Sequence, residues 1–470
     1  MRLPLRSVID LAGLVAQQSL STVDAYAAKE IPAARAGLLA NIGHDGGKSH
    51  GALPGLVVAS PSTQNPNYLY TWTRDSSLVF KPLVDQVTSG EDPSLRSLVD
   101  SFITVESKIQ QTSNPSGTVT SGGLGEPKFN IDGTAFTLPW GRPQRDGPAL
   151  RSTTMMAYGN WLLDHGNTSF VQTTLWPIIQ LDLDYVAQNW NKSTFDLWEE
   201  VNSSSFFTAA VQHRSLREGS AFASRLEQGN LTLAYTSQAD RALCFMQSFW
   251  NPKRGYITAN TGGGRSGIDA NTVLASIHTF DPSAGCDATT FQPCSDKALA
   301  NLVTYIEAFR STYPLNSNAS TSGALATGRY PEDTYYGGNP WYLSIAAVSE
   351  QLYDAYGVWA NASQIEVTSI SLPFFRRLLP NITIGTYASG SSVFTSITAA
   401  TRRLADDFLA LHAKYTPADG SLSEQFDRST GAPKSAADLT WNYAALITAF
   451  RARDGRVMNS WGARGLHASC

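Results

Sequence analysis

A short acidic run in the middle of the sequence could carry acid–base chemistry. The segment Asp196-Leu-Trp-Glu-Glu places three carboxylates within five residues, with Trp198 among them. Carboxylates this close repel one another and an indole excludes water, and both effects raise the pKa of a carboxyl group toward the value that a general acid needs. Taken alone, the run is more typical of the solvated acidic start of a helix.

A second carboxylate that could act with this run lies far along the chain. Glu424 stands in the segment Ser421-Leu-Ser-Glu-Gln-Phe-Asp427, where a lone glutamate would ordinarily be exposed. Glu199 and Glu424 together would supply the two groups of glycoside hydrolysis: an acid that protonates the leaving oxygen, and a carboxylate that activates water or attacks the sugar carbon. Their spacing along the sequence does not give their separation in space, so the stereochemical outcome stays open.

Three further segments combine charged side chains with Trp and Tyr, as a sugar-binding surface would. Tyr68-Leu-Tyr-Thr-Trp-Thr-Arg-Asp75 holds an Arg–Asp pair beside aromatic residues, and the two others are 139–148 and 328–341. An arginine and an aspartate can bind neighbouring sugar hydroxyls while a ring packs on the apolar face of the sugar. The alternatives are a structural salt bridge beside a buried tryptophan in the first segment and a rigid turn in the second.

The composition narrows the classes of partner. Among 470 residues, charged residues make up 16% and aromatic residues 10%, and the formal net charge is −4 without any basic run. Nucleic-acid binding needs clustered Lys and Arg, and a bilayer span needs about 20 apolar residues, so the sequence predicts no nucleic-acid and no membrane partner. No Cys-x-x-Cys or His-x-x-x-His spacing is present, so neither a metal nor another cofactor is expected. We expect a monomer that recognises a neutral, polar ligand such as a sugar.

Amphipathic helices supply the framework that must position these segments. In 95–109, the apolar residues Leu95, Val99, Phe102 and Val105 fall on one face. Similar stripes occupy 149–163, 171–188, 297–309, 342–358, 401–414 and 441–451. Long loops rich in Gly, Pro, Ser and Asn lie between them, at 42–67, 112–148, 256–270, 314–341 and 416–437. About a dozen helices without a repeat period favour a closed ring of helical hairpins over a solenoid, with one site built by the loops.

Several features favour secretion. Residues 1–18 are a candidate signal peptide, although Asp10 interrupts the apolar run and an ordinary first helix is the alternative. Seven Asn-x-Ser/Thr sequons are candidate glycosylation sites. They are Asn167, Asn191, Asn202, Asn230, Asn318, Asn361 and Asn381. We therefore expect a secreted, extracellular protein.

The four cysteines could form two disulfides, which fits a secreted protein. They allow three pairings. Cys286 and Cys294 bracket a polar loop, which favours a bond between them and leaves Cys244 for Cys470. A Cys244–Cys470 bond would close a very long loop. By loop-closure entropy, such a bond would contribute about 4–5 kcal/mol to the free energy of unfolding. Four reduced thiols are the alternative.

Taken together, these segments resemble glycoside hydrolase family 15, the family of the fungal glucoamylases. The runs that carry the resemblance are Tyr70-Thr-Trp-Thr-Arg-Asp, Gly125-Glu-Pro-Lys-Phe-Asn, Trp140-Gly-Arg-Pro-Gln-Arg-Asp-Gly-Pro, Asp196-Leu-Trp-Glu-Glu-Val-Asn, Gly328-Arg-Tyr-Pro-Glu-Asp-Thr-Tyr-Tyr and Ser423-Glu-Gln. They occur in the family's order and at family-like spacing over residues 20–470.

The resemblance implies an (α/α)6 barrel that acts on starch and malto-oligosaccharides. It implies removal of terminal glucose from non-reducing ends with inversion, as β-D-glucose, at α-1,4 linkages and more slowly at α-1,6 linkages. Carried over residue by residue, it makes Glu199 the general acid, Glu424 the general base and Ser435 a donor that tunes the base. Arg74 and Asp75 are implied to clamp the hydroxyls of the terminal glucose. Further implied substrate-binding positions are Tyr68, Trp72, Trp140, Leu197, Trp198, Glu200, Arg329, Asp333, Tyr335, Trp341 and Trp441. The family's disulfides correspond to the two pairs favoured above.

Some features depart from the family pattern. Fungal members carry a Ser/Thr-rich linker and a starch-binding module after the catalytic domain, whereas this sequence stops at Cys470. We therefore expect a single catalytic domain over residues 19–470, with weaker action on raw granules than on soluble starch. Phe136 and Pro139 stand where relatives often have Tyr and Ser, which leaves the chain-length preference open. A related barrel hydrolase acting on trehalose or dextran, and a non-catalytic glucan-binding protein on the same scaffold, are the alternatives.

Overall fold

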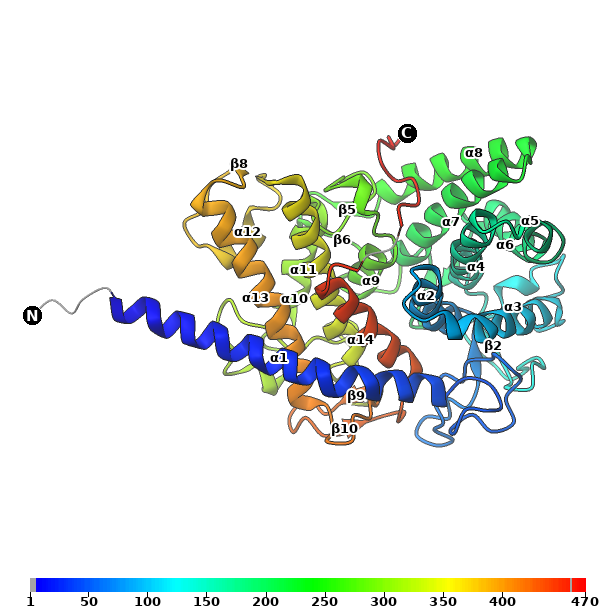
Figure 1. Cartoon of the computed structure of the whole chain (residues 1–470), viewed down its shortest axis with the longest axis horizontal. Helices are drawn as coiled ribbons and strands as arrows, with labels where there is room; N and C mark the ends of the chain where they lie inside the picture. Colours follow the sequence, from blue (N-terminus) through cyan, green and yellow to red (C-terminus); the bar gives the residue numbers. More distant parts are fainter. Residues whose placement is uncertain (1–5, 457–458) are drawn as a thin grey trace, which may run out of the picture.

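Helices form most of the molecule (Figure 1), and the inner ones pack side by side into a closed ring. The computed structural model describes residues 6–456 and 459–470, without the side chains of residues 6–21. In this part of the chain, α2 packs on α4, α4 on α7, α7 on α9, α9 on α11, α11 on α14, and α14 on α2 again. These inner helices are α2 (Thr73–Thr88), α4 (Asp146–Asp164), α7 (Phe206–Arg225), α9 (Asn271–His278), α11 (Tyr342–Ala362) and α14 (Thr440–Arg453).

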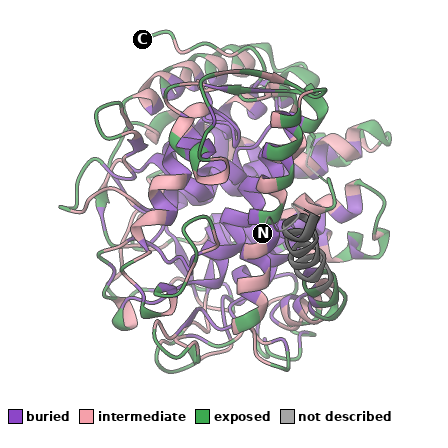
Figure 2. Ribbon diagram, turned by 90° about the vertical axis from the view of Figure 1, so that its left-hand side faces the viewer, coloured by how far each residue is buried: buried purple, intermediate pink, exposed green. Residues whose placement is uncertain are grey.

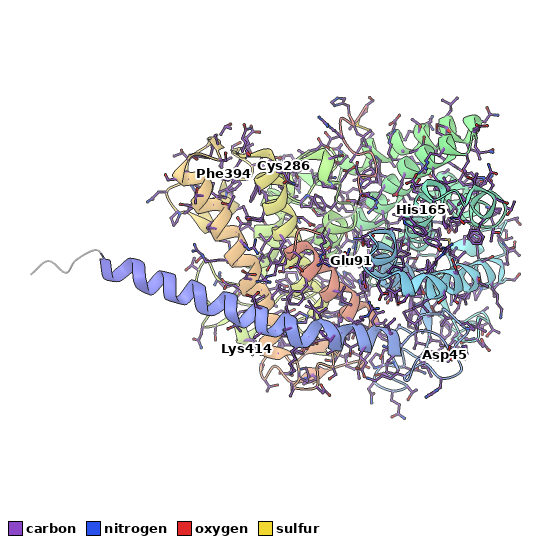
Figure 3. The ribbon with its side chains drawn as sticks, viewed as in Figure 1. Asp45, Glu91, His165, Cys286, Phe394 and Lys414 are labelled. Carbon is purple, nitrogen blue, oxygen red and sulfur yellow. A yellow bond between two sulfur atoms is a disulfide. The ribbon has the colours of Figure 1, made fainter. Side chains whose placement is uncertain are left out.

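An outer helix precedes each inner helix in the chain and covers the ring from outside. For example, α13 packs on α11, and α8 packs on α7. The outer helices are α1 (Arg6–Ala40), α3 (Arg96–Gln111), α6 (Trp176–Asn189), α8 (Gly229–Gln247), α10 (Asp296–Ala308) and α13 (Ser392–Tyr415). Figure 3 labels Phe394 and Lys414 near opposite ends of α13. This alternation of outer and inner helices is the closed ring of helical hairpins that the sequence predicts, and the (α/α)6 barrel that the family resemblance implies.

The place of a helix in the ring decides how much of its surface is buried (Figure 2). Inner helix α11 buries side chains on every face over most of its length, because helices or loops surround it. Outer helix α3 buries one stripe that includes Val99, Phe102 and Val105, as its apolar periodicity predicts. The stripes predicted from sequence coincide with α3, α4, α6, α10, α11, α13 and α14.

The remaining elements are short and brace the loops between helices. The strands form antiparallel pairs: β1 (Thr71–Trp72) with β2 (Lys128–Phe129), β3 (Thr194–Phe195) with β4 (Asn202–Ser203), β5 (Trp250–Asn251) with β6 (Tyr256–Ile257), β7 (Gln364–Val367) with β8 (Gly385–Ala388), and β9 (Gln425–Phe426) with β10 (Pro433–Lys434). Short helical segments complete the chain: α5 (Thr168–Phe170), α12 (Leu372–Leu378), η1 (Pro93–Leu95), η2 (Gly123–Gly125), η3 (Val171–Leu175), η4 (Pro282–Ala284), η5 (Pro314–Asn316) and η6 (Tyr335–Gly337).

The structure tests the predicted disulfides but not the candidate signal peptide. The Cys244–Cys470 disulfide joins α8 to the C-terminus, and Cys286–Cys294 closes the loop before α10, so both predicted pairs are present. The candidate signal peptide at 1–18 lies outside the residues whose side chains are described, and it stays a prediction. Within the described residues, no helix has the length and apolar character needed to cross a bilayer.

Candidate active site

A cavity of about 600 Å³ lies at the end of the ring where the inner helices begin. Arg74 and Asp75 line it from the first turn of α2, and Trp441 lines it from the first turn of α14. Trp140 and Glu199 line it from the loops that lead into α4 and α7. Because these helices all start at this end, the positive ends of their dipoles gather around the cavity and favour carboxylates there.

Glu199 is held in the cavity wall by groups from two other loops. Its Oε1 accepts hydrogen bonds from Trp72 Nε1 at 2.6 Å and from Gln144 Nε2 at 2.9 Å, and Arg74 Nη2 lies 3.8 Å away. The backbone of Glu199 has a φ of +68°, a left-handed conformation that costs free energy for any residue with a side chain. The surrounding structure therefore fixes both the carboxylate and the backbone that carries it.

The neighbouring carboxylates do not crowd Glu199 as the sequence suggests. Asp196 Oδ1 accepts the backbone N–H groups of Glu200 and Val201, so Asp196 holds the turn rather than facing the cavity. Glu200 forms ion pairs with Arg329 at 2.9 Å and Arg265 at 2.5 Å. Burial raises the pKa of the Glu200 carboxyl, but the two guanidinium groups and the Tyr330 hydroxyl outweigh burial and leave that pKa below its ordinary value.

Glu424 is the most deeply buried carboxylate of the cavity, at 2% exposed. Its Oε2 accepts hydrogen bonds from the Ser435 hydroxyl and from Gln425 Nε2. Burial raises the pKa of Glu424 to about 7, while Ser435, Arg329 and Tyr68 act in the opposite direction. In the β9–β10 pair, Gln425 stands opposite Lys434, and the same antiparallel register carried one residue further places Glu424 opposite Ser435. The predicted proximity of Ser435 to Glu424 is therefore a consequence of strand register.

The base of the cavity is charged and buried. Arg74 and Asp75 are 5% and 8% exposed. Arg74 Nη1 donates to Gln144 Oε1 at 2.7 Å and to Asp146 Oδ2 at 3.3 Å. Burial raises the pKa of Asp75 to about 6, against the attraction of Arg74. This pair offers fixed charges and hydrogen-bonding groups to a ligand that reaches the bottom of the cavity.

Arg329 faces the cavity from the loop before α11. Its guanidinium donates to both oxygens of Asp333, at 2.8 Å and 2.7 Å, in a two-pronged contact that fixes its plane. Its guanidinium carbon lies 5.2 Å from the ring centre of Trp341 and 4.9 Å from that of Tyr335. The Tyr335 hydroxyl is hydrogen-bonded to that of Tyr68 at 2.7 Å, which links this wall to the loop before α2.

Most of the residues predicted from sequence meet at this cavity. Those that line it are Tyr68, Trp72, Arg74, Asp75, Trp140, Leu197, Trp198, Glu199, Glu200, Arg329, Tyr335, Trp341, Glu424 and Trp441. Asp333 and Ser435 are not part of the lining and reach it through Arg329 and Glu424.

Comparison with known proteins identifies the family. The profile described as Glycosyl hydrolases family 15 matches residues 32–451. The chain belongs to this family of glycoside hydrolases. It is 58% identical to Glucoamylase-1 of Schizophyllum commune over 98% of this chain and 80% of that protein. It is 50% identical to a glucoamylase of Neurospora crassa over 96% of this chain and 72% of that protein.

Solved structures of the family agree with the fold. A family 15 glucoamylase from Hypocrea jecorina superposes with a TM-score of 0.93 at 51% identity, covering 95% of this chain and 76% of that one. A glucoamylase from Saccharomycopsis fibuligera superposes with a TM-score of 0.86 at 32% identity, covering 92% of this chain and 96% of that one. The likeness therefore extends over nearly the whole barrel of this glycoside hydrolase.

The sequence interpretation missed several residues at or beside the cavity of this family 15 enzyme, among them Lys128, which lines it, and Gln144, which contacts two of its lining residues. Lys128 Nζ lies 3.5 Å from the ring centre of Trp140 and 4.0 Å from that of Tyr70, with Trp72 and Phe136 also around it. Burial lowers the pKa of Lys128 to about 8, although the charge of Glu199 opposes that change. Gln144 bridges Arg74 and Glu199. Lys128 and Gln144 both lie in sequence runs that resemble the family, and this resemblance could have identified them as site residues.

Other predicted sites on this enzyme are surface features. Six of the seven sequon asparagines are exposed, and Asn167 is partly exposed, as attachment of a glycan requires. Among the described residues, no group of three or more His, Cys, Asp or Glu side chains could hold a metal ion.

Proposed function

We propose that this glycoside hydrolase is an exo-acting glucoamylase. It removes terminal glucose from the non-reducing ends of starch and malto-oligosaccharides, at α-1,4 linkages and more slowly at α-1,6 linkages. The observation that carries the proposal is one cavity lined by both Glu199 and Glu424, with the Arg74–Asp75 pair at its base. The relatives named above, which bear the name glucoamylase, support the substrate class.

The place where the cavity ends supports exo action. Below Arg74 and Asp75, the next residues of α2, Ser76 to Phe80, are buried in the ring. A glucan end can enter such a cavity, whereas an internal stretch of chain would have to pass through the packed helices. The buried charges then bind the hydroxyls of the last glucose unit, so cleavage releases a single glucose.

Hydrolysis with inversion needs an acid on one side of the glycosidic bond and a base that activates water on the other. We assign Glu199 as the acid that protonates the leaving oxygen and Glu424 as the base, with β-D-glucose as the product. Ser435 and Gln425 donate to Glu424 Oε2 and so stabilise its ionised, water-activating form.

One observation favours the reverse assignment. Burial raises the pKa of Glu424 to about 7, and a carboxyl that holds its proton is suited to act as an acid. The substrate α-D-glucosyl fluoride separates the two assignments, because fluoride leaves without being protonated while water must still be activated. We expect Glu199→Gln to lose maltose hydrolysis but keep hydrolysis of the fluoride, and Glu424→Gln to lose both. If Glu424→Gln alone keeps hydrolysis of the fluoride, the roles are exchanged.

Proton NMR of the sugar released from maltoheptaose in the first minutes tests the rest of the proposal. Fresh β-glucose as the sole product agrees with an inverting exo-glucohydrolase. α-Glucose would mean retention and would make one carboxylate a nucleophile. Rapid hydrolysis of trehalose or dextran in place of maltoheptaose would assign another substrate, and binding without any product would leave a glucan-binding protein.

The setting of this activity is part of the same proposal. Exposed sequons and two disulfides suit a secreted, extracellular enzyme. Residues 19–470 would act as one catalytic domain and as a monomer, without a cofactor. Deglycosylation followed by mass spectrometry of the secreted protein would identify the occupied sequons and the mature N-terminus.

A further inference from the structure

One wall of the cavity mouth is an apolar ribbon formed by Phe136, Leu138 and Trp140. All three side chains line the cavity, while Thr137 and Pro139 between them do not. The segment has no helical structure. The backbone bends at Leu138, and the side chains of all three residues reach the cavity.

Surrounding groups hold this ribbon in place. Arg142 donates to the backbone oxygen of Leu138 at 2.9 Å and to that of Phe136 at 3.3 Å, and its Nε pairs with Glu126 at 2.9 Å. The rings of Phe136 and Trp140 meet edge to face, with centres 5.7 Å apart. The exposed side chain of Leu138 is therefore attached to a braced backbone, and not to a loose loop.

Leu138 is unusual among the apolar residues of the described chain. Its exposed fraction is 62%, and the other exposed large apolar side chains, Phe170, Leu233 and Ile384, lie outside the cavity. The charges that suit sugar hydroxyls lie deeper, where Arg74 and Asp75 are buried. On this side, the buried ammonium of Lys128 lies against the rings of Phe136 and Trp140, so the exposed apolar surface at the mouth is mainly that of Leu138. Covering Leu138 would remove apolar surface from water.

We propose that the Phe136–Leu138–Trp140 ribbon binds apolar aglycones, so that this chain also hydrolyses α-D-glucosides of hydrophobic alcohols. The inference rests on the proposed function, because the glucose unit would bind at the same bottom of the cavity and the same two carboxylates would catalyse the reaction. The bond between the anomeric carbon and the aglycone oxygen breaks. That oxygen takes the proton of the acid, and water gives its hydroxyl to the anomeric carbon and its proton to the base. The products are glucose and the free alcohol.

A series of n-alkyl α-D-glucosides tests the proposal, because methyl, butyl and hexyl glucosides have nearly the same leaving group and differ in apolar length. We expect kcat/KM to rise about tenfold from methyl to hexyl glucoside, since each added methylene can be covered by the ribbon. In Leu138→Ser, the hexyl-to-methyl ratio should fall below about threefold. Thr137→Ala, which changes the adjacent side chain that does not line the cavity, should keep the full ratio.

Other results would overturn the inference. A wild-type ratio near one would show that the ribbon does not bind the alkyl chain, and an unchanged ratio in Leu138→Ser would place the alkyl chain elsewhere. Maltose hydrolysis is measured in parallel for every variant. Absence of maltose hydrolysis by the wild-type protein would contradict the proposed function. If the wild-type protein hydrolyses maltose but kcat/KM is the same for all alkyl glucosides, only the aglycone site is contradicted.

Discussion

Trp72 Nε1 lies 2.6 Å from Glu199 Oε1, and this hydrogen bond joins the start of α2 to the loop that precedes α7. Gln144, from the loop before α4, donates to the same oxygen at 2.9 Å. The segments that lead into three consecutive inner helices therefore meet at one carboxylate oxygen. Within the described chain, both of these hydrogen bonds reach Oε1, so in the proposed acid role of Glu199 the proton would be delivered from Oε2.

Removing the Trp72 donor should impair the chemistry more than binding. Trp72→Phe keeps an aromatic ring beside Lys128 but loses the N–H that orients Glu199. In the proposed mechanism Glu199 becomes a carboxylate as it gives up its proton, and a hydrogen bond to a charged group contributes about 1.5–3 kcal/mol, so we expect kcat on maltose to fall by about 10- to 100-fold. Trp161→Phe, on α4 and stacked on His165, is the matched control. A raised KM with unchanged kcat would mean that Trp72 contacts only the substrate.

Ser435→Ala should change the pH dependence in a direction that also tests the catalytic roles. The Ser435 hydroxyl stabilises the ionised form of Glu424, so its removal raises the pKa of that carboxyl. A base must be ionised to act, so the acid limb of the kcat/KM profile should move to higher pH by about 0.5–1 unit. Ser421→Ala, whose hydroxyl bonds the exposed Asp419, is the control. Movement of the alkaline limb instead would identify Glu424 as the acid.

Glu424 should also reduce stability at high pH. Its pKa rises from 4.5 to about 7 on folding, so the folded state binds more protons than the unfolded chain between these values. The free energy of unfolding therefore falls as the pH rises through this window. Glu424→Gln removes the buried charge, and urea unfolding should show it about 1–3 kcal/mol more stable than the wild type at about pH 8, with little difference at about pH 4.

Exposed Glu366 provides the comparison for that measurement, since Glu366→Gln removes a carboxylate that folding does not bury. It should leave the free energy of unfolding nearly unchanged at both pH values. Equal destabilisation of Glu424→Gln at the two pH values would contradict the argument, because it would assign the effect to packing and not to the buried charge.

The two disulfides should differ in what they contribute to stability. Cys244–Cys470 spans 226 residues and Cys286–Cys294 spans 8. A longer closed loop removes more entropy from the unfolded chain. We expect the Cys244→Ser/Cys470→Ser double variant to lose about 2–4 kcal/mol of unfolding free energy. The Cys286→Ser/Cys294→Ser variant should lose less, and the opposite order would show that native-state contacts dominate.

Much of the framework is predictable because its signals are local. Apolar residues at helical spacing predict α3, α10 and α13, since every turn of such a helix must bury the same face. The apolar stripe is weaker in an inner helix, which other parts of the protein surround on all sides. Inner helix α7 buries both polar and apolar side chains along its length, including Gln212 and Arg214, and its periodicity gives little indication of the ring.

The sequence by itself determined which side chains could do the chemistry: two glutamates, an Arg–Asp pair and a set of aromatic residues in long loops. Only the tertiary structure decided how they act together. Closure of the ring places Glu199 and Glu424 around one cavity, and it turns Asp196 and Glu200 from apparent partners of Glu199 into a turn support and an ion pair. It also gathers four rings around Lys128. The physical reason is that helix formation depends on neighbours along the chain, whereas the charge state of a carboxylate depends on groups that folding alone brings near.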